Sequence, residues 1–176
     1  MTGWVGGRGL LTLGVIISLM VGCSGSGGGG SSAPAAQADT VAGVDANNNG
    51  VRDDVDQYLA TTYADPAQAP TKAALTQYAQ VLQSAIVDAA SPTTTATAAA
   101  SLAPVVVQHA QEMVDAIECL GATRPTDFAI LESELRGVAV DTDMRQQAYL
   151  DAARLAEAVV NQVQFRTFET WAAACR

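Results

Sequence analysis

The sequence predicts an all-α fold, a small helical bundle of about four to five helices, with an N-terminal loop and a flexible tether before it. Three observations predict this fold. Apolar residues recur at intervals of three and four from Val51 onward, which is the spacing of one helix face. No segment alternates between apolar and polar residues for long, as a half-buried strand does. Alanine, the strongest helix former, is abundant.

Prolines delimit the first two helices. The first is expected from Val51 to the Asp65-Pro66 pair, because the residue before a proline avoids the α region. The second begins near Pro70, since proline suits a first helical turn, and closes at Ser91-Pro92. The residues expected to face the core are Val55, Tyr58, Leu59 and Thr62 in the first helix, and Leu75, Tyr78, Ala79, Leu82, Ala85 and Ile86 in the second.

The third helix is expected between Pro104, again suited to a first turn, and Gly121, a natural helix stop. Residues 93–100, just before it, are rich in threonine and alanine and form either a loop or a weak helical turn. The residues of this helix expected to face the core are Val106, Ala110, Met113, Ile117 and Leu120.

Two further helices complete the predicted bundle. Residues 124–127 (Arg-Pro-Thr-Asp) are typical of a helix start, and Gly137 lies near the end of that helix. The last helix begins at Asp141 or Thr142, each a capable N-cap. Its expected core residues are Ala148, Ala152, Leu155, Val159 and Val163. The C-terminal aromatic residues are expected in the core rather than on an exposed partner-binding patch, and they are Phe165, Phe168 and Trp171.

The start of the chain indicates export. Arg8 precedes an apolar run, residues 10–21, which is followed by Gly22-Cys23 and a glycine-serine segment. A positive residue, an apolar core and a small residue at the cleavage point mark an export signal. The run is about 12 residues long, and a membrane-spanning helix needs roughly 20, which disfavours an uncleaved anchor.

Residues 19–23 (Leu-Met-Val-Gly-Cys) resemble the lipobox of bacterial lipoproteins, in which Met20 is a tolerated departure from leucine. The resemblance implies that residues 1–22 are a signal peptide and that Cys23 is acylated, with palmitate as a typical acyl group. Ser24, where lipoproteins of the inner membrane carry aspartate, favours the outer membrane, facing the periplasm. Ordinary cleavage to a secreted or periplasmic protein is the alternative.

The rest of the chain divides into a tether and one domain. Residues 23–42 are expected to be the lipidated cysteine and a Gly/Ser-rich tether, and residues 43–176 a helical domain with a loop at 45–56. Once residues 1–22 are removed, 8 basic side chains stand against 18 acidic ones. Such a surface repels phosphate backbones, which excludes nucleic acid as a partner. The negative surface also disfavours attraction to anionic lipid head groups, so the acyl chains on Cys23 are expected to attach the protein to the lipid bilayer.

The two cysteines that follow Cys23 are expected to form a disulfide. Cys119 and Cys175 lie far apart in the chain, and disulfides persist in the compartment that the signal predicts. Closing so long a loop would stabilise the fold by about 4 kcal/mol in the chain-entropy model. Two buried free thiols are the alternative.

Residues 45–56 read DANNNGVRDDVD and have the spacing of an EF-hand calcium loop. Gly50 stands at the sharp turn, and the expected oxygen ligands are Asp45, Asn47, Asn49, the backbone carbonyl of Val51, Asp53 and Asp56. Two ligand positions hold neutral asparagines and the last holds the shorter aspartate, so we expect modest affinity for Ca²⁺, on the order of 10⁻⁴–10⁻³ M. A metal-free turn that caps the next helix is the alternative.

No obvious helix precedes this loop in the sequence, and it is therefore closer in resemblance to the aspartate-rich calcium loops of thrombospondin type 3 repeats and dockerins. The wider segment GVDANNNGVRDDVDQYL, with a helical remainder and two late cysteines, resembles a bacterial family of small exported proteins of unknown function. That resemblance implies an exported, helical protein with a calcium loop, and it implies no reaction.

The single histidine, His109, is more typical of a helix residue than of a catalytic base, and no nucleophile or nucleotide motif accompanies it. We therefore expect a membrane-anchored envelope lipoprotein that is not an enzyme. Its calcium-stabilised helical domain would have a structural or protein-binding role, with an envelope protein as partner. The alternatives are an enzyme or enzyme inhibitor that uses a cleft near His109, and a helical bundle that carries a small ligand.

Overall fold

The computed structural model describes residues 40–91 and 99–176, and in the second range it describes side chains from Pro104 onward. The expected signal peptide, Cys23 and the tether up to Asp39 lie outside the described residues, as do residues 92–98. The described residues form helices and contain no strand, which confirms the all-α prediction. Their bounds are α2 (Asp53–Thr62), η1 (Pro66–Gln68), α3 (Ala69–Ala89), α4 (Ala99–Thr123), α5 (Phe128–Ala139), α6 (Asp143–Val159), η3 (Val160–Gln162) and η4 (Phe168–Ala174).

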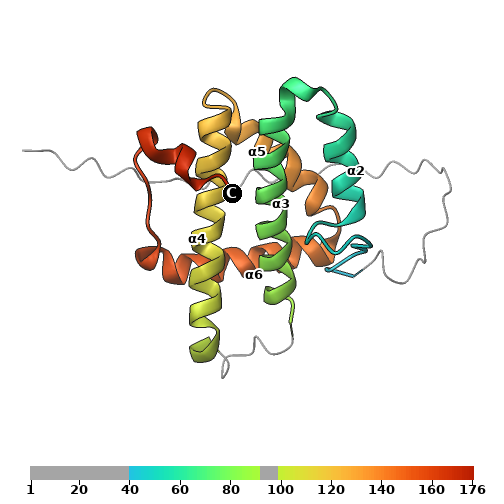
Figure 1. Ribbon diagram of the computed structural model, residues 1–176. Coiled ribbons are helices and arrows are strands. Elements are labelled where there is room, and N and C mark those ends of the chain that lie inside the picture. Colours follow the sequence, from blue (N-terminus) through green and yellow to red (C-terminus); the bar gives the residue numbers. More distant parts are fainter. Residues whose placement is uncertain (1–39, 92–98) are drawn as a thin grey trace, which may run out of the picture. The chain divides into compact units, whose positions relative to one another are not determined.

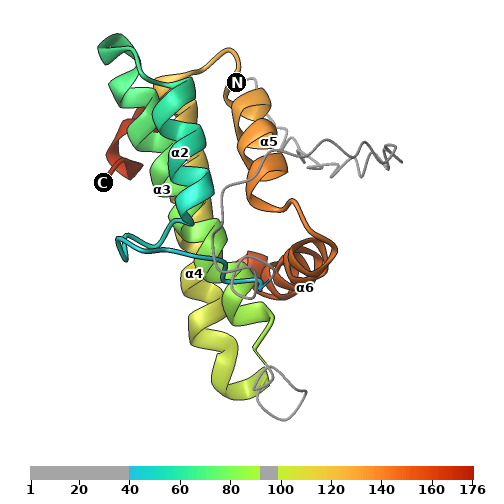
Figure 2. The ribbon, with the colours of Figure 1, turned by 90° about the vertical axis from the view of Figure 1, so that its right-hand side faces the viewer.

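Helix α3 lies at the centre of this domain. It runs alongside α4 on one side and α2 on the other, and it also contacts α5 and α6 (Figures 1 and 2). Helix α6 crosses α3 and α4 at a steep angle, and the segment after α6 returns along the outer side of α4 (Figure 1). No helix in the described part of the chain is long and apolar enough to span a membrane.

The core forms where the apolar face of α3 meets its neighbours. The residues predicted for that face are buried, apart from the half-buried Ala85. The side chains that meet it include Val55 and Leu59 of α2, Leu120 of α4, Leu135 of α5 and Ala148 of α6, each at most 3% exposed. Removal of this apolar surface from water is the main stabilising contribution to the bundle.

The ends of the helices follow local signals in most places. Pro70 stands in the first turn of α3, as predicted, and Thr142 is the N-cap of α6, where its hydroxyl accepts a hydrogen bond from the backbone N–H of Arg145. In α2 the predicted core position Thr62 is exposed, and Tyr63 is buried in its place. Val55, Leu59 and Tyr63 are four residues apart, so they continue the same face of the helix.

One prediction for the start of the third helix is wrong. Helix α4 begins at Ala99, so Pro104 lies inside the helix and not in its first turn. Alanine has the highest helix propensity, and residues 98–100 are three alanines, which favours an earlier start. The cost is one missing backbone hydrogen bond, because proline has no N–H to donate.

Gly121 was predicted to end the third helix, and this is wrong. Helix α4 continues to Thr123. The glycine is needed for packing instead. A Cβ atom at position 121 would lie 2.5 Å from Cζ3 of the Trp171 indole, which packs against this point of the helix. The absence of a side chain therefore lets the C-terminal segment approach α4 closely.

The C-terminal aromatic residues were predicted in the core, and for two of them this is wrong. Phe165 is 66% exposed and Phe168 is 59% exposed, whereas Trp171 is half-buried. Helix α6 ends at Val159, so Val163 also lies beyond the helix that was expected to contain it. Residues 163–167 are not helical, and helical spacing therefore does not place these side chains on one buried face.

Gly121→Ala should lower the free energy of unfolding by about 1–3 kcal/mol, because the new methyl group must displace Trp171 in a packed region. Gly137→Ala in α5 is the matched control. Nothing lies within 4 Å of a Cβ atom at position 137, so this change should stabilise the chain by about 0.5–1 kcal/mol. Urea unfolding of the oxidised protein measures both effects, and equal effects at the two glycines would contradict the packing argument.

Candidate functional site

The aspartate loop, residues 45–56, turns sharply at a glycine and is held by its own first aspartate. Gly50 has φ of +83°, a conformation that glycine adopts without strain. Its N–H donates to Oδ2 of Asp45 at 2.9 Å, and the N–H of Asn49 donates to Oδ1 of the same carboxylate at 3.1 Å. The carboxylate of Asp45 therefore shapes the turn from inside.

The two predicted asparagine ligands lie next to the predicted last ligand. The side-chain amides of Asn47 and Asn49 both donate to Oδ2 of Asp56, at 3.1 and 2.7 Å. Asn47 and Asn49 also accept backbone N–H groups two residues ahead through their Oδ1 atoms, at 3.0 and 2.8 Å. Asn47, Asn49 and Asp56, which are the third, fifth and twelfth residues of the loop counted from Asp45, are thus brought together at the start of α2.

The remaining predicted ligands lie less centrally. Asp53 accepts the N–H of Ala46 through Oδ1 at 3.0 Å, which ties the two ends of the loop. The side chain of Val51 is 1% exposed and belongs to the hydrophobic core. No group of three or more His, Cys, Asp or Glu side chains placed to hold a metal ion occurs within residues 40–91 and 104–176. Calcium binding therefore stays a prediction.

The loop is anchored to the bundle by a buried arginine, Arg52, whose side chain is 1% exposed. Its guanidinium donates to the backbone carbonyl of Ala139 at 2.8 Å, and it pairs with Asp54 at 2.6 Å and with Asp141 at 3.3 Å. A Cβ atom on Gly43 would collide with the stem of this arginine. Arg52 thus joins the loop, the start of α2 and the junction between α5 and α6.

A second buried arginine, Arg145 of α6, extends this network to the first described residues. It pairs with Asp141 at 2.7 Å, and it donates to the backbone carbonyls of Thr40 at 2.8 Å and Val41 at 3.4 Å. On the α3 side the chain is held by Gln83, which donates to the carbonyl of Ala42 at 3.0 Å. The entry of the chain into the domain is therefore fixed from two helices.

Two ionisable groups of this network, Arg52 and Asp54, have pKa values shifted from their usual ones. Burial acts against the charged form of Arg52, but its hydrogen bonds and charge interactions with Asp54 and Asp141 prevail and raise the pKa of the guanidinium above its usual value. Burial likewise acts to raise the pKa of Asp54, but the hydrogen bond and the charge of Arg52, together with backbone hydrogen bonds, outweigh it and lower that pKa. Both groups are therefore held in their charged forms at neutral pH.

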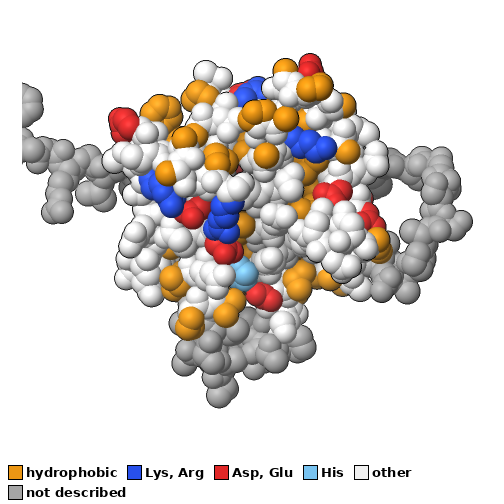
Figure 3. All heavy atoms as spheres, in the orientation of Figure 1, with side chains coloured by type: hydrophobic (Ala, Val, Ile, Leu, Met, Phe, Trp, Pro, Cys, Tyr) orange, Lys and Arg blue, Asp and Glu red, His pale blue; other side chains and the backbone are white. Residues whose placement is uncertain are grey.

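His109 lies at a groove between the aspartate loop, α3 and α4. The groove has a volume of about 760 Å³, and its lining includes Asp45, Asp88 and His109. Nε2 of His109 is 2.7 Å from Oδ2 of Asp88, and Figure 3 shows the histidine at the surface beside acidic side chains. The other ring nitrogen, Nδ1, is buried and has no hydrogen-bond partner in the described part of the chain. Nδ1 lies 3.9 Å from Oε2 of Glu112, so the groups that pair with the ring in the described residues are carboxylates and not a serine or cysteine nucleophile.

The C-terminal strap, residues 163–176, is fastened along α4 by charged and polar side chains. The N–H and guanidinium of Arg166 donate to Glu118 at 2.7 and 2.8 Å, and the guanidinium also pairs with Asp115 at 2.6 Å. Gln111 exchanges two hydrogen bonds with the backbone of Gln164. The bonded residues of α4 are three or four apart, so they form one row on the helix.

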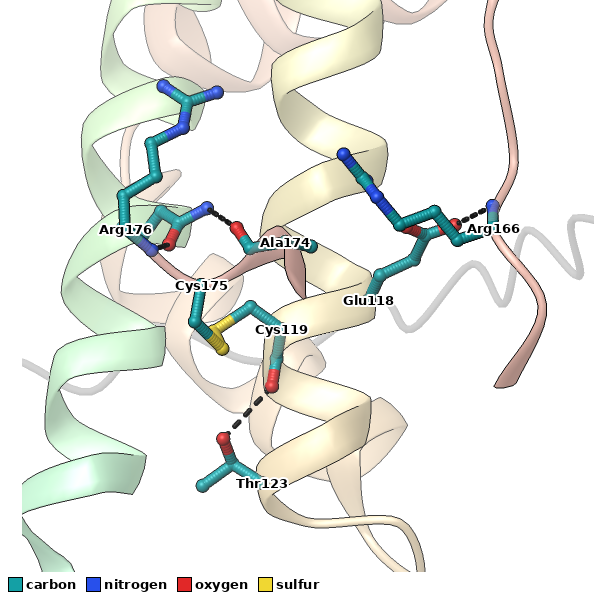
Figure 4. The surroundings of a disulfide bond; sticks show 8 residues. Glu118, Cys119, Thr123, Arg166, Ala174, Cys175 and Arg176 are labelled. Carbon is teal, nitrogen blue, oxygen red and sulfur yellow. Dashed lines mark hydrogen bonds and ion pairs between the residues drawn. A yellow bond between two sulfur atoms is a disulfide. The ribbon is translucent and has the colours of Figure 1, made fainter. Parts of the chain in front are cut away.

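The predicted disulfide between Cys119 and Cys175 is present in the structure and pins the end of the strap (Figure 4). Beside it, Gln77 of α3 donates to the carbonyl of Ala174 at 3.1 Å and accepts the N–H of Arg176 at 3.1 Å. The disulfide therefore joins the C-terminus to α4, and Gln77 joins it to α3.

Reasoning from the sequence located the loop and the disulfide but missed the residues that fasten them. Arg52, Arg145, Glu118 and Gln77 are all buried, and each bonds to a residue at least 48 positions away. A charged residue in a helix or loop usually faces solvent, and nothing in its immediate sequence neighbours signals a distant partner.

No known protein family, curated protein or solved structure matches this chain.

Arg52→Met should lower the free energy of unfolding by about 1–3 kcal/mol, because it leaves the carbonyl of Ala139 and the carboxylate of Asp54 without their donor. Arg154→Met is the control, since the side chain of Arg154 is 70% exposed and its loss should change stability by less than about 0.5 kcal/mol. Urea unfolding at neutral pH measures both. Equal losses would show that Arg52 does not anchor the loop.

Proposed function

We propose that this chain is a membrane-anchored envelope lipoprotein, attached through an acylated Cys23, whose helical domain has a structural or protein-binding role. The lipobox resemblance of residues 19–23 supports attachment. The observation that carries the proposal in the described residues is the disulfide between Cys119 and Cys175. Such bonds are rare in reducing compartments and persist in the periplasm and outside the cell.

The role proposed for the domain is not catalytic. The groove beside His109 offers one histidine–carboxylate pair, and the polar clusters elsewhere in the described residues are occupied by contacts that hold the fold together. Arg52 and Arg145 fasten the entry of the chain, and Arg166 fastens its exit. This distribution favours a rigid module that presents surfaces, with an envelope protein as a partner.

We further propose that the aspartate loop binds Ca²⁺ with modest affinity. The donor set is suited to a hard cation, because carboxylates and amide oxygens are the ligands that Ca²⁺ prefers. Asp45, Asn47, Asn49 and Asp56 would hold it, with Asp53 and the carbonyl of Val51 as further ligands. The proximity of Asn47, Asn49 and Asp56 supports this choice, and binding requires both amides to present oxygen instead of nitrogen. Bound calcium would supply charge that closes the loop against α2.

Acylation is tested by growing cells that express the full chain with radiolabelled palmitate. The wild-type protein should carry label and sediment with membranes, whereas Cys23→Ser should carry none and should lose its processing or its membrane attachment. Cys119→Ser is the control, because it also replaces a cysteine and breaks the disulfide but leaves the lipobox intact, so the label and the membrane attachment should persist. An unlabelled wild-type chain, or a Cys23→Ser chain that is processed and sediments unchanged, would refute the anchor.

Calcium binding is tested by calorimetry and by thermal unfolding of the purified protein with 0 and about 10 mM Ca²⁺. If the dissociation constant lies between 10⁻⁴ and 10⁻³ M, this concentration should stabilise the protein by about 1.4–2.7 kcal/mol. Asp45→Ala/Asp56→Ala should abolish the binding heat and this gain.

The control for calcium is Glu134→Ala/Glu157→Ala, which removes two exposed carboxylates from other helices and makes the same change in net charge. It should leave the calcium effect intact. Absence of heat in the wild-type protein at millimolar Ca²⁺ would refute the metal loop and would leave the anchoring proposal untouched.

A further inference from the structure

The strap exposes apolar side chains although it is firmly held. Phe165 is 66% exposed and Phe168 is 59% exposed, and Val160, just before the strap, is 55% exposed. On the inner side the strap is fixed to α4 by Arg166, by the Gln164 backbone and by the disulfide. These phenylalanines are therefore not on a loose tail that could fold back onto the core.

Two of the three aromatic residues of the strap, Phe168 and Trp171, form a group with Phe128 of α5. The rings of Phe168 and Trp171 are 5.0 Å apart in an edge-to-face arrangement, and the Trp171 ring lies 6.0 Å from that of Phe128 in α5. The indole N–H donates to the carbonyl of Arg166 at 3.3 Å. Trp171 thus packs against Phe168, which remains 59% exposed in this contact. Exposed aromatic side chains on a firmly held segment, here Phe165 and Phe168, are typical of a surface that contacts another molecule.

Charge restricts the kind of partner. Residues 154–176 carry three arginines and two glutamates, whereas residues 40–153 carry five basic and fifteen acidic side chains. The C-terminal segment itself is therefore less acidic than the rest of the domain, and its arginines Arg166 and Arg176 offset carboxylates of α4, so an anionic surface repels this segment less than the rest. A bilayer of an envelope membrane is such a surface, and aromatic side chains are favoured at its interface because they bury an apolar ring beside the polar head groups.

The length of the chain makes this surface accessible. Thr40, whose carbonyl is held by Arg145 near the start of α6, is separated from Cys23 by sixteen residues. At about 3.5 Å per residue these can span at most about 60 Å. Helix α6 has 17 residues, so it extends about 25 Å from that point toward Val160 and the strap. An anchor at Cys23 therefore leaves the strap within reach of the same bilayer.

We propose that Phe165 and Phe168 insert into the head-group region of the membrane that holds Cys23, so that the strap is a second and reversible membrane contact. The inference rests on the proposed lipid anchor. It assigns the strap side of α4 to the membrane, and it directs the aspartate loop, which lies beside α2 on the other side of the bundle, toward the aqueous compartment (Figure 1).

Trp171 provides a local probe for this contact. The chain has two tryptophans, so Trp4→Phe leaves Trp171 as the single one whether or not the signal peptide is removed. The acylated protein, purified in detergent, is reconstituted into vesicles of phosphatidylcholine and phosphatidylglycerol, with and without bromine atoms on the acyl chains near the head groups. Bromine quenches indole emission only at close range. We expect a loss of Trp171 emission in the brominated vesicles.

Phe165→Ser, which removes a side chain without a ring contact to Trp171, should largely abolish this loss, and Phe165→Ser/Phe168→Ser should abolish it fully. Ile130→Ser is the matched control, because Ile130 is 61% exposed on α5, and quenching should persist. Circular dichroism of each variant confirms that it remains folded.

The outcomes separate the two proposals. A protein that floats with the vesicles but shows no bromine quenching overturns the membrane contact alone. Emission that shifts with protein concentration and is indifferent to bromine assigns the aromatic pair to a second copy of the chain and likewise overturns it. A protein that carries no acyl group and does not float overturns the anchor and this inference with it.

Discussion

The buried guanidinium of Arg52 is the interaction on which the N-terminal part of the domain depends. Removing an arginine from water is costly unless its charge is paired and its N–H groups are bonded. The structure meets this requirement with partners from three places, namely Asp54 at the start of α2, the carbonyl of Ala139 at the end of α5, and Asp141 before α6. The position of the aspartate loop is consequently determined by residues almost ninety positions away.

The C-terminal part depends on a comparable constraint. Glu118 of α4 is buried, with 6% of its side chain exposed, and Arg166 satisfies it through both backbone and side chain. The disulfide joins Cys119 and Cys175 in the unfolded chain as well, so it lowers the conformational entropy of that state and thereby stabilises the fold. Gly121 completes the arrangement, since the indole of Trp171 occupies the space where a side chain would lie. Beyond its helices, the bundle is therefore held at both ends by bonds that cross between elements.

These two constraints place different surfaces on opposite sides of α3 and α4. The aspartate loop lies beside α2, and the strap lies along the outer side of α4 (Figure 1). Helix α6 crosses between them, with Arg145 near one end and Val160 just beyond the other. A rigid domain of this kind holds the polar aspartate loop and the exposed apolar side chains of the strap at a constant separation.

The sequence by itself determined the helical class, most helix ends and the pairing of the cysteines. Those features depend on local propensity, on proline and capping residues such as Thr142, and on the small number of cysteines. It also located the aspartate loop, since the loop bonds of Asp45, Asn47 and Asn49 join residues close in the chain. Local patterns failed at Pro104 and Gly121, where a longer helix and the packing of Trp171 override the usual meaning of these residues.

Only the tertiary structure decided which charged residues are buried and which aromatic residues are exposed. Arg52 and Arg145 each have one partner nearby in the chain, but these two arginines and Glu118 also bond to distant residues, and no spacing in the chain encodes those distant contacts. Phe165 and Phe168 stay exposed because the chain leaves the helical path after α6 and the strap is fastened by its polar side. The physical reason is the same in each case: burial is a property of the assembled surfaces, and local sequence specifies only the elements that are assembled.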